Sequence, residues 1–378
     1  MPTVKREIHK NIESVLFKNR IIIIYGARQV GKTTLIKEIQ KKFKDDSVYY
    51  NCDEPDIREA FTNKTSTELR TLVGNKRLLF IDEAQRVRNI GITLKLINDN
   101  FRETQIIATG SSSFDLSNEI AEPLTGRKFE FVIYPFSISE LMEIHSRLEI
   151  DRLLETRILK GMYPDVVLKE ENSDLILKDI TRSYLYRDVL QYQSIKNPDL
   201  LNRLLQALAL QVGNEVSYNE LSNLVSLDKK TVASYIELLE KAFVIFRLSP
   251  FSRNLRNELT KLRKIYFIDT GIRNALINNF NTLDLRNDTG DLWENFLISE
   301  RIKSNNNNNI QVNNYFWRTH QQHEIDYLEE SKGQLKAFEI KWNKSRPGKG
   351  KDLFTSTYKG SEFRLINNKN YSDFILRQ

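Results

Sequence analysis

The chain has 378 residues, of which 57 are lysine or arginine and 50 are aspartate or glutamate, so its formal net charge is +7. This length predicts two or three domains, and a content of 40% hydrophobic and 28% charged residues excludes an intrinsically disordered chain. The basic pI of about 9.1 favours a nucleic-acid partner, although a well-solvated surface of mixed charge explains it equally well.

The sequence also limits where the protein acts. No stretch approaches the roughly 18 consecutive apolar residues that a membrane helix requires, and the first residues are too polar for a signal peptide. We therefore expect a cytoplasmic protein without a membrane partner. Cys52 is the only cysteine, which excludes an intrachain disulfide and a cysteine-rich zinc site.

The first part of the chain alternates apolar, β-branched segments with helical ones. A strand is expected at residues 21–24 and a helix at 32–43, and the further strands lie at 47–51, 78–81, 105–109 and 128–136. Such alternation is typical of a parallel sheet with helices on both faces. We expect an α/β domain at residues 1–145.

Residues 26–33, Gly-Ala-Arg-Gln-Val-Gly-Lys-Thr, match all eight positions of the phosphate loop and join the first strand to the first long helix. Such a loop surrounds phosphates with backbone N–H groups, and Lys32 would reach the β and γ oxygens of ATP while Thr33 ligates Mg²⁺. The residues expected to bind ATP here are Gly26, Ala27, Arg28, Gln29, Val30, Gly31, Lys32, Thr33 and Thr34.

Two acids follow the strand at 78–81, at the strand end where ligands of open α/β sheets bind. Asp82 would hold the water shell of Mg²⁺, and Glu83 would polarise the attacking water, which predicts an ATPase. At the end of the next strand, the hydroxyls of Thr109, Ser111 and Ser112 either orient that water or sense the γ-phosphate, or they form an ordinary turn. Arg127 is either a catalytic finger on the ATP of a neighbouring copy, which requires a homo-oligomer, or a plain surface arginine.

The pattern changes after residue 145. Helical segments are expected at 139–148 and 151–159, and residues 146–198 are interpreted as a helical lid. Residues 199–270 read as three helices followed by a hairpin, which predicts a winged helix-turn-helix. Its third helix, at 228–241, would read DNA or would pack against protein; the four side chains concerned are Lys229, Lys230, Ser234 and Tyr235.

Residues 271–378 are expected to form a further α/β domain. It begins with a helix at 291–302, and the asparagine run at 305–309 is interpreted as a flexible turn. Strands are expected at 315–318, 324–329 and 335–340, followed by a basic loop.

Taken in order, these segments make the chain resemble the bacterial and archaeal AAA-type P-loop ATPases whose second half carries a restriction-endonuclease-like core. The residues that carry the resemblance are GARQVGKTTL at 26–35, LLFIDEAQ at 78–85, ATGSSS at 108–113, LTGR at 124–127, GMYPDVV at 161–167, YRDV at 186–189, YFIDTGIRNAL at 266–276 and GDLWENFLISE at 290–300. The resemblance implies an ATPase domain followed by a nuclease-like domain.

Four residues of the last domain resemble the acid, acid and acid-x-lysine pattern of restriction-endonuclease cores: Glu294, Asp326, Glu339 and Lys341. Residues 339 and 341 are two apart on one strand and therefore project from the same face. The resemblance implies that Asp326 and Glu339 hold a divalent metal, that Glu294 completes its shell, and that Lys341 stabilises the attacking water or the developing charge. The alternative is that these side chains are solvated on exposed strand faces and have no catalytic role.

Three functions follow from these features. In the first, ATP binding and hydrolysis control a domain that engages DNA and cleaves it. In the second, an ATP-gated DNA-binding or assembly protein carries a catalytically silent nuclease fold. In the third, the protein is a remodelling ATPase that does not bind nucleic acid.

Overall fold

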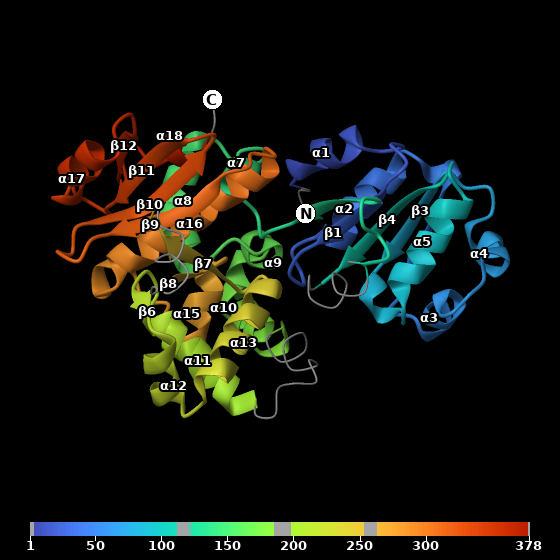
Figure 1. The fold of residues 1–378 in the computed structure, drawn as a ribbon, viewed down its shortest axis with the longest axis horizontal. Helices are drawn as coiled ribbons and strands as arrows, with labels where there is room; N and C mark the ends of the chain where they lie inside the picture. The colour runs from blue at the N-terminus through green and yellow to red at the C-terminus, as the bar shows by residue number, and fades with distance from the viewer. Residues whose placement is uncertain (1–3, 112–119, 121, 185–197, 253–262, 377–378) are drawn as a thin grey trace. The chain divides into compact units, whose positions relative to one another are not determined.

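The computed structural model describes residues 4–111, 120, 122–184, 198–252 and 263–376. The chain divides into two compact units, one formed by Lys5–Pro135 with Lys241–Phe243 and the other by Met1–Val4, Phe136–Glu240 and Val244–Gln378. Figure 1 labels the elements of both units. The four domain boundaries expected from the sequence stay predictions, but the regions divided at residues 198 and 270 lie within the same unit.

The first unit is built on a five-stranded sheet in which all neighbouring strands are parallel. Its strands in chain order are β1 (Ile21–Tyr25), β2 (Ser47–Asn51), β3 (Leu78–Asp82), β4 (Gln105–Gly110) and β5 (Lys128–Val132). Their order across the sheet is β2-β3-β4-β1-β5, which brings β1, β3 and β4 together in its middle. The predicted α/β class with a parallel sheet is confirmed here, although β5 ends four residues earlier than expected.

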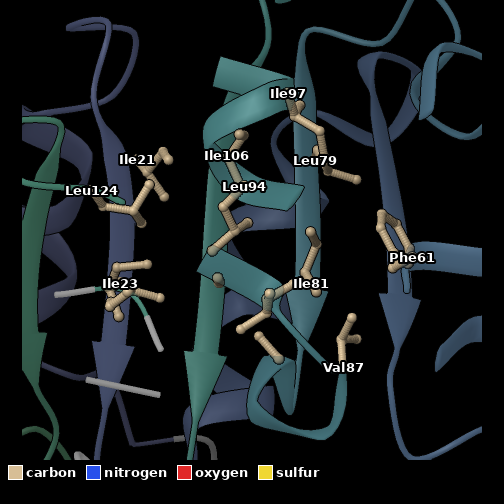
Figure 2. Close-up of a cluster of buried hydrophobic side chains, with 14 of the residues drawn as sticks. Ile21, Ile23, Phe61, Leu79, Ile81, Val87, Leu94, Ile97, Ile106 and Leu124 are labelled. Carbon is tan, nitrogen blue, oxygen red and sulfur yellow. The ribbon is translucent and has the colours of Figure 1, made fainter. Parts of the chain in front are cut away.

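Helix α1 (Ile8–Ser14) precedes the first strand, and the helices that follow strands of this sheet are α2 (Lys32–Lys41), α3 (Pro55–Phe61), α4 (Ser66–Val73) and α5 (Ile90–Asn100). Strand residues at alternate positions, such as Ile21 and Ile23, pack with Phe61 of α3 and Leu94 of α5 in one buried cluster (Figure 2). Every residue of β1, β3 and β4 is buried, as expected for a sheet that is covered on both faces.

The second unit begins with the helices α7 (Ile138–Leu141), α8 (Arg147–Lys160), α9 (Pro164–Leu168) and α10 (Ser173–Tyr184). The continuous helix expected at 139–148 is wrong. Ser137 and Ser146 each start a separate helix through a capping box, because their hydroxyls accept hydrogen bonds from the backbone N–H groups of Glu140 and Glu149.

Three helices and three strands come next: α11 (Pro198–Leu210), β6 (Glu215–Val216), α12 (Tyr218–Val225), α13 (Lys229–Lys241), β7 (Ile245–Pro250) and β8 (Arg263–Phe267). Strand β8 pairs antiparallel with both β7 and β6. The three helices and the strands β7 and β8 occur in the order expected from the sequence, whereas β6 between α11 and α12 was not expected. The assignment of this region as a winged helix-turn-helix stays a prediction.

The remaining elements are α15 (Thr270–Leu276), α16 (Thr289–Asn307), β9 (Asn313–Arg318), β10 (Glu324–Ser331), β11 (Gln334–Ile340), α17 (Gly350–Thr357), β12 (Glu362–Ile366) and α18 (Ser372–Ile375). Strand β9 pairs parallel with β7, so the two parts share a seven-stranded mixed sheet of order β12-β11-β10-β9-β7-β8-β6. Strand β8 and helix α16 are in contact.

The interpretation of residues 305–309 as a flexible turn is wrong for the first three asparagines, which complete α16. Asn305 and Asn307 are buried, and the Asn305 side chain donates a hydrogen bond to the Glu329 carboxylate at 2.7 Å. A tertiary partner on β10 therefore overrides the weak helix propensity of asparagine.

Candidate functional site

The phosphate loop connects the end of β1 to the start of α2, as the sequence predicts. A Cβ on Gly26 would lie 2.3 Å from the backbone oxygen of Ile133, so no larger residue fits there without a backbone shift. Gly31, the residue before α2, has φ of 96°, a left-handed conformation that favours glycine. Both glycines are therefore required by the backbone path of the loop.

The Lys32 side chain is buried against this loop. Its ammonium donates hydrogen bonds to the carbonyl oxygens of Gly26 and Ala27 at 2.8 and 2.9 Å. The lysine thus spans the loop that it belongs to and places a positive charge inside it. Thr34, the third residue of α2, is exposed.

Thr33 and Asp82 meet at the ends of neighbouring elements. The Thr33 hydroxyl donates to the Asp82 carboxylate at 2.7 Å, and Asp82 also accepts hydrogen bonds from the hydroxyls of Tyr49 and Thr109. Burial, together with the hydrogen bond to Asp82, raises the pKa of Tyr49, so its hydroxyl stays protonated and donates. A buried carboxylate is held in place by three hydroxyls from α2, β2 and β4.

Glu83 directly follows β3 and has the left-handed φ of 53°. Its backbone N–H donates to the Thr109 hydroxyl at 3.1 Å, and the Gln85 amide donates both to the Glu83 carboxylate at 2.6 Å and to Ser111 at 3.0 Å. Glu83 and Ser111 are therefore joined through Gln85. Ser112 lies outside the described residues.

Two residues of this arrangement were not predicted as site residues, Tyr49 and Gln85. Thr109 was expected among the hydroxyls at this strand end, and its hydroxyl contacts Asp82 and the backbone N–H of Glu83. The strand pairing places it there, because Ile81 is paired with Ala108 and the next residues are Asp82 and Thr109. Arg127 lies outside this group of hydrogen bonds. It forms an ion pair with Asp99 at 3.3 Å, in which both side chains are 42% exposed.

A second group of charged residues lies in the other compact unit. Lys341 donates to the Asp326 carboxylate at 3.2 Å and lies 3.8 Å from the Glu339 carboxylate. The backbone N–H of Ile340 donates to Asp326 at 2.7 Å, and that of Gly348 donates to Glu339 at 2.9 Å. Strands β10 and β11 thus bring three of the four predicted residues together.

Glu294 joins this group from α16. Its carboxylate accepts hydrogen bonds from the Tyr266 hydroxyl at 2.6 Å and from the Lys264 ammonium at 3.2 Å. Lys264 is also ion-paired with Glu324, the first residue of β10. Lys264, Tyr266 and Glu324 were not predicted as site residues, because nothing in the sequence shows that β8 lies beside α16.

Burial dominates the electrostatics of this cluster. It raises the pKa of Glu294 to about 7 despite the opposing charge of Lys264, and it also raises the pKa of Glu339. Burial would lower the pKa of Lys341, but the charges of Asp326 and Glu294 raise it. A cavity of about 360 Å³ opens beside the cluster, lined by Glu294 and Lys341 together with residues such as Asp291 and Trp342.

The part of the chain that the structure describes contains no group of three or more histidine, cysteine, aspartate or glutamate side chains arranged to hold a metal ion. Asp326 and Glu339 provide two carboxylates. Within the same described ranges, no helix is both long and apolar enough to cross a membrane. The cytoplasmic location stays a prediction.

The four side chains named on the third helix differ in accessibility. Lys229, Lys230 and Ser234 are exposed on α13, whereas Tyr235 is buried in the core of the unit. The expectation that Tyr235 faces a nucleic acid is therefore wrong, because helical periodicity turns it toward the same core as Val232 and Leu239.

Three family models match the chain in succession: an AAA domain at residues 18–142, a domain of unknown function (DUF8612) at 151–283 and a domain of unknown function (DUF4143) at 289–372. The AAA match covers the parallel sheet and the phosphate loop. The acid cluster combines Lys264 and Tyr266 from the second match with residues of the third.

The chain is 30% identical over 348 residues to the uncharacterized protein MJ1544 of Methanocaldococcus jannaschii, an alignment that covers 85% of this chain and 74% of the relative. It is 25% identical over 341 residues to the uncharacterized protein Rv2008c of Mycobacterium tuberculosis, covering 89% and 74%. The crystal structure of the Pif1 helicase from Candida albicans aligns with 48% of each chain at 15% identity and a TM-score of 0.27. The chain belongs to the same protein family as MJ1544. In this chain, the AAA domain precedes the DUF8612 and DUF4143 domains.

Proposed function

We propose that the AAA domain binds Mg²⁺·ATP at the phosphate loop and hydrolyses it. The observation that carries this proposal is the contact between the Thr33 hydroxyl and the Asp82 carboxylate beside the buried Lys32 ammonium. These groups are the hydroxyl, the acid and the cation that a phosphate-loop ATPase requires, and they meet at the carboxyl ends of β1 and β3.

Each residue has a distinct role in this proposal. Lys32 leaves the carbonyls of Gly26 and Ala27 and neutralises the β and γ oxygens, while the N–H groups of the loop bind the β-phosphate. Thr33 would ligate Mg²⁺ and Asp82 would hold its water shell, and the ion would offset the negative charge that develops on the phosphate oxygens. The hydrogen bonds from Tyr49 and Thr109 keep the Asp82 carboxylate oriented.

Glu83 is the base that orients the attacking water. Its carboxylate is held by Gln85, which also contacts Ser111 at the end of β4. Arg127 would act on the ATP of a neighbouring copy only after leaving Asp99. Because exposed ion pairs contribute about 0–1 kcal/mol, this exchange costs little.

The first experiment measures ATP binding and phosphate release by the wild-type protein and by Lys32→Ala. We expect ATP turnover to fall on the order of 10²–10³-fold, since one preorganised charge next to the phosphates is lost. Lys41→Ala is the matched control, because Lys41 is an exposed lysine of the same helix. Equal turnover in all three proteins would contradict the proposal.

A second function is favoured by the acid cluster: metal-dependent cleavage of a DNA phosphodiester by a restriction-endonuclease-like core. The cluster draws on α16, β10 and the end of β11, which supply Glu294, Asp326, Glu339 and Lys341. The charges of the three acids act on the Lys341 ammonium, which lies beside a cavity. Residues separated by up to 47 positions thus converge, as this reaction requires.

The donor set fits a hard divalent cation, because Asp326 and Glu339 are buried and both would ligate through carboxylate oxygens. Such an ion would supply an activated water next to the phosphate. Lys341 would neutralise the charge that accumulates on the phosphate oxygens, and its partial exposure lets a substrate reach it. The exposed Lys229 and Lys230 and the net charge of +7 favour DNA as the substrate.

The test incubates plasmid and linear DNA with the full-length protein, Mg²⁺ or Mn²⁺, and with or without ATP. Asp326→Asn is expected to abolish cleavage and to retain ATP turnover, whereas Asp352→Asn, an exposed control on α17, retains both. A change in cleavage by Lys32→Ala would show that ATP controls the site. Intact DNA in every tube, with ATP turnover present, would instead favour an ATP-gated binding or assembly protein with a silent core.

A further inference from the structure

Lys264 occupies an unusual place for a lysine. Only 4% of its side chain is exposed, and its ammonium contacts two carboxylates, Glu294 on α16 at 3.2 Å and Glu324 on β10. The ring of Phe316 lies 5.7 Å away and closes another side of the ammonium. Three elements of the unit therefore meet at this one cation.

The two carboxylates around this ammonium have further partners. Glu294 also accepts a hydrogen bond from the Tyr266 hydroxyl at 2.6 Å. Glu324 is the first residue of β10, the strand that also carries Asp326. The ammonium of Lys264 thus lies between Glu294 and Glu324, and its removal would leave the Arg318 guanidinium, 3.9 Å away, as the cation beside Glu324.

Lys264 and Lys341 differ in access to solvent. One third of the Lys341 side chain is exposed, 33%, and it lines the cavity beside the cluster. Lys264 is enclosed, is not among the residues lining that cavity, and is held by partners on two sides. A substrate phosphate would therefore meet Lys341, whereas Lys264 acts only through the carboxylates that it holds.

We propose that Lys264 is a positioning residue that replaces a second divalent cation between Glu294 and Glu324. This inference rests on the metal-dependent cleavage proposed above, and it limits that site to one metal ion, at Asp326 and Glu339. A two-metal site needs a cation near both groups of acids. Here a lysine from β8 supplies that charge, so the region before the C-terminal domain is required to complete its site.

The experiment titrates the full-length protein with Mn²⁺ in the absence of nucleotide, and the unbound Mn²⁺ is measured by electron paramagnetic resonance. Lys264→Met is expected to bind one Mn²⁺ per chain more than the wild type, because the ammonium that lies between the two carboxylates is lost. Lys264→Arg retains the charge and is expected to bind the wild-type number. Lys264→Met combined with Glu324→Gln is expected to lose the additional ion.

A merely structural lysine would not raise the number of bound ions when it is replaced. An unchanged number in a folded Lys264→Met protein overturns the inference, whatever the outcome of the DNA cleavage test. If the wild type binds no Mn²⁺ and Lys264→Met binds one ion, the result supports the proposed role of Lys264 and overturns the metal site at Asp326 and Glu339. If Lys264→Met does not fold, Lys264→Gln, which retains N–H donors, replaces it with the same expectations.

Discussion

The two candidate sites hold their acids in different ways. In the AAA domain, Asp82 accepts hydrogen bonds from three hydroxyls, on Thr33, Tyr49 and Thr109. In the C-terminal cluster, the acids also contact the ammonium groups of Lys264 and Lys341, in addition to neutral N–H and O–H donors. Neutral donors orient a carboxylate and leave its negative charge in place, whereas lysines compensate that charge before any ligand binds.

Because of this difference, the two sites are expected to bind cations under different conditions. An acid that keeps its charge attracts Mg²⁺ together with ATP, so binding at the first site is expected to depend on nucleotide. A cluster that already contains two lysines has less net negative charge to attract a metal ion. The number of metal ions that it binds is therefore expected to change when one of these lysines is replaced. Substitutions that alter charge should therefore affect one site without the other.

The largest effect is expected for Glu83→Gln. The substitution retains the size of the side chain but removes the base, so ATP turnover is expected to fall on the order of 10²–10³-fold while ATP still binds. Phosphate release and binding of a fluorescent ATP analogue measure the two quantities. Glu59→Gln, on the exposed side of α3, is the control. Loss of binding in Glu83→Gln would mean that Glu83 is part of the binding site rather than the base.

Asp288→Asn should destabilise the unit that carries the acid cluster. Burial would raise the pKa of Asp288, but hydrogen bonds and charges from Arg286 and Arg273 outweigh it and lower the pKa to about 2. Because this pKa is depressed, its stabilisation is present above pH 4, the ordinary range of an aspartate, and decreases as the pH falls through 2. We expect a loss of about 2 kcal/mol in the free energy of unfolding at pH 7.

Urea unfolding of wild type and Asp288→Asn between pH 7 and pH 3 checks this sign. The difference between the two proteins is expected to narrow below pH 4. A difference that stays constant over this range would show that the charge of Asp288 is not its origin. Turnover of ATP at neutral pH serves as the control that the AAA domain is unaffected.

Thr109→Val tests whether the hydroxyls around Asp82 orient it for Mg²⁺. Valine has the same shape and suits β4, but it cannot donate to the carboxylate. The Mg²⁺ concentration needed for half-maximal ATP turnover is expected to rise about 10-fold. Thr93→Val removes another buried hydroxyl, on α5, and should leave the Mg²⁺ dependence unchanged. Equal shifts in both variants would indicate a general loss of stability.

The smallest effect is expected for Tyr266→Phe. The variant loses the 2.6 Å hydrogen bond to Glu294, and the free energy of unfolding should decrease by about 1 kcal/mol. ATP turnover is expected to remain at the wild-type value. Tyr235→Phe is the matched control, because the described residues offer no hydrogen bond to its hydroxyl. If both variants lose the same stability, the bond to Glu294 contributes nothing.

The sequence predicted the phosphate loop and the parallel sheet well, because both are encoded in contiguous residues. The loop from Gly26 to Thr33 needs only the end of one strand and the start of the next helix. The break between α7 and α8, each of which begins with a capping box, and the end of α16 were mispredicted. There, the capping hydroxyl of Ser146 and the hydrogen bond from Asn305 to the buried Glu329 decide the structure. Hydrophobic periodicity contains no information about either contact.

The sequence by itself determined the residues of the phosphate loop, the acids after β3 and the succession of strands, since each depends on local order along the chain. Only the tertiary structure decided which groups surround those acids. Thr109 reaches Asp82 across 27 residues because β3 and β4 are neighbours in the sheet, and Lys264 reaches Glu294 across 30 residues because β8 packs against α16. Such contacts depend on strand order and helix packing, and no short pattern of residues specifies them.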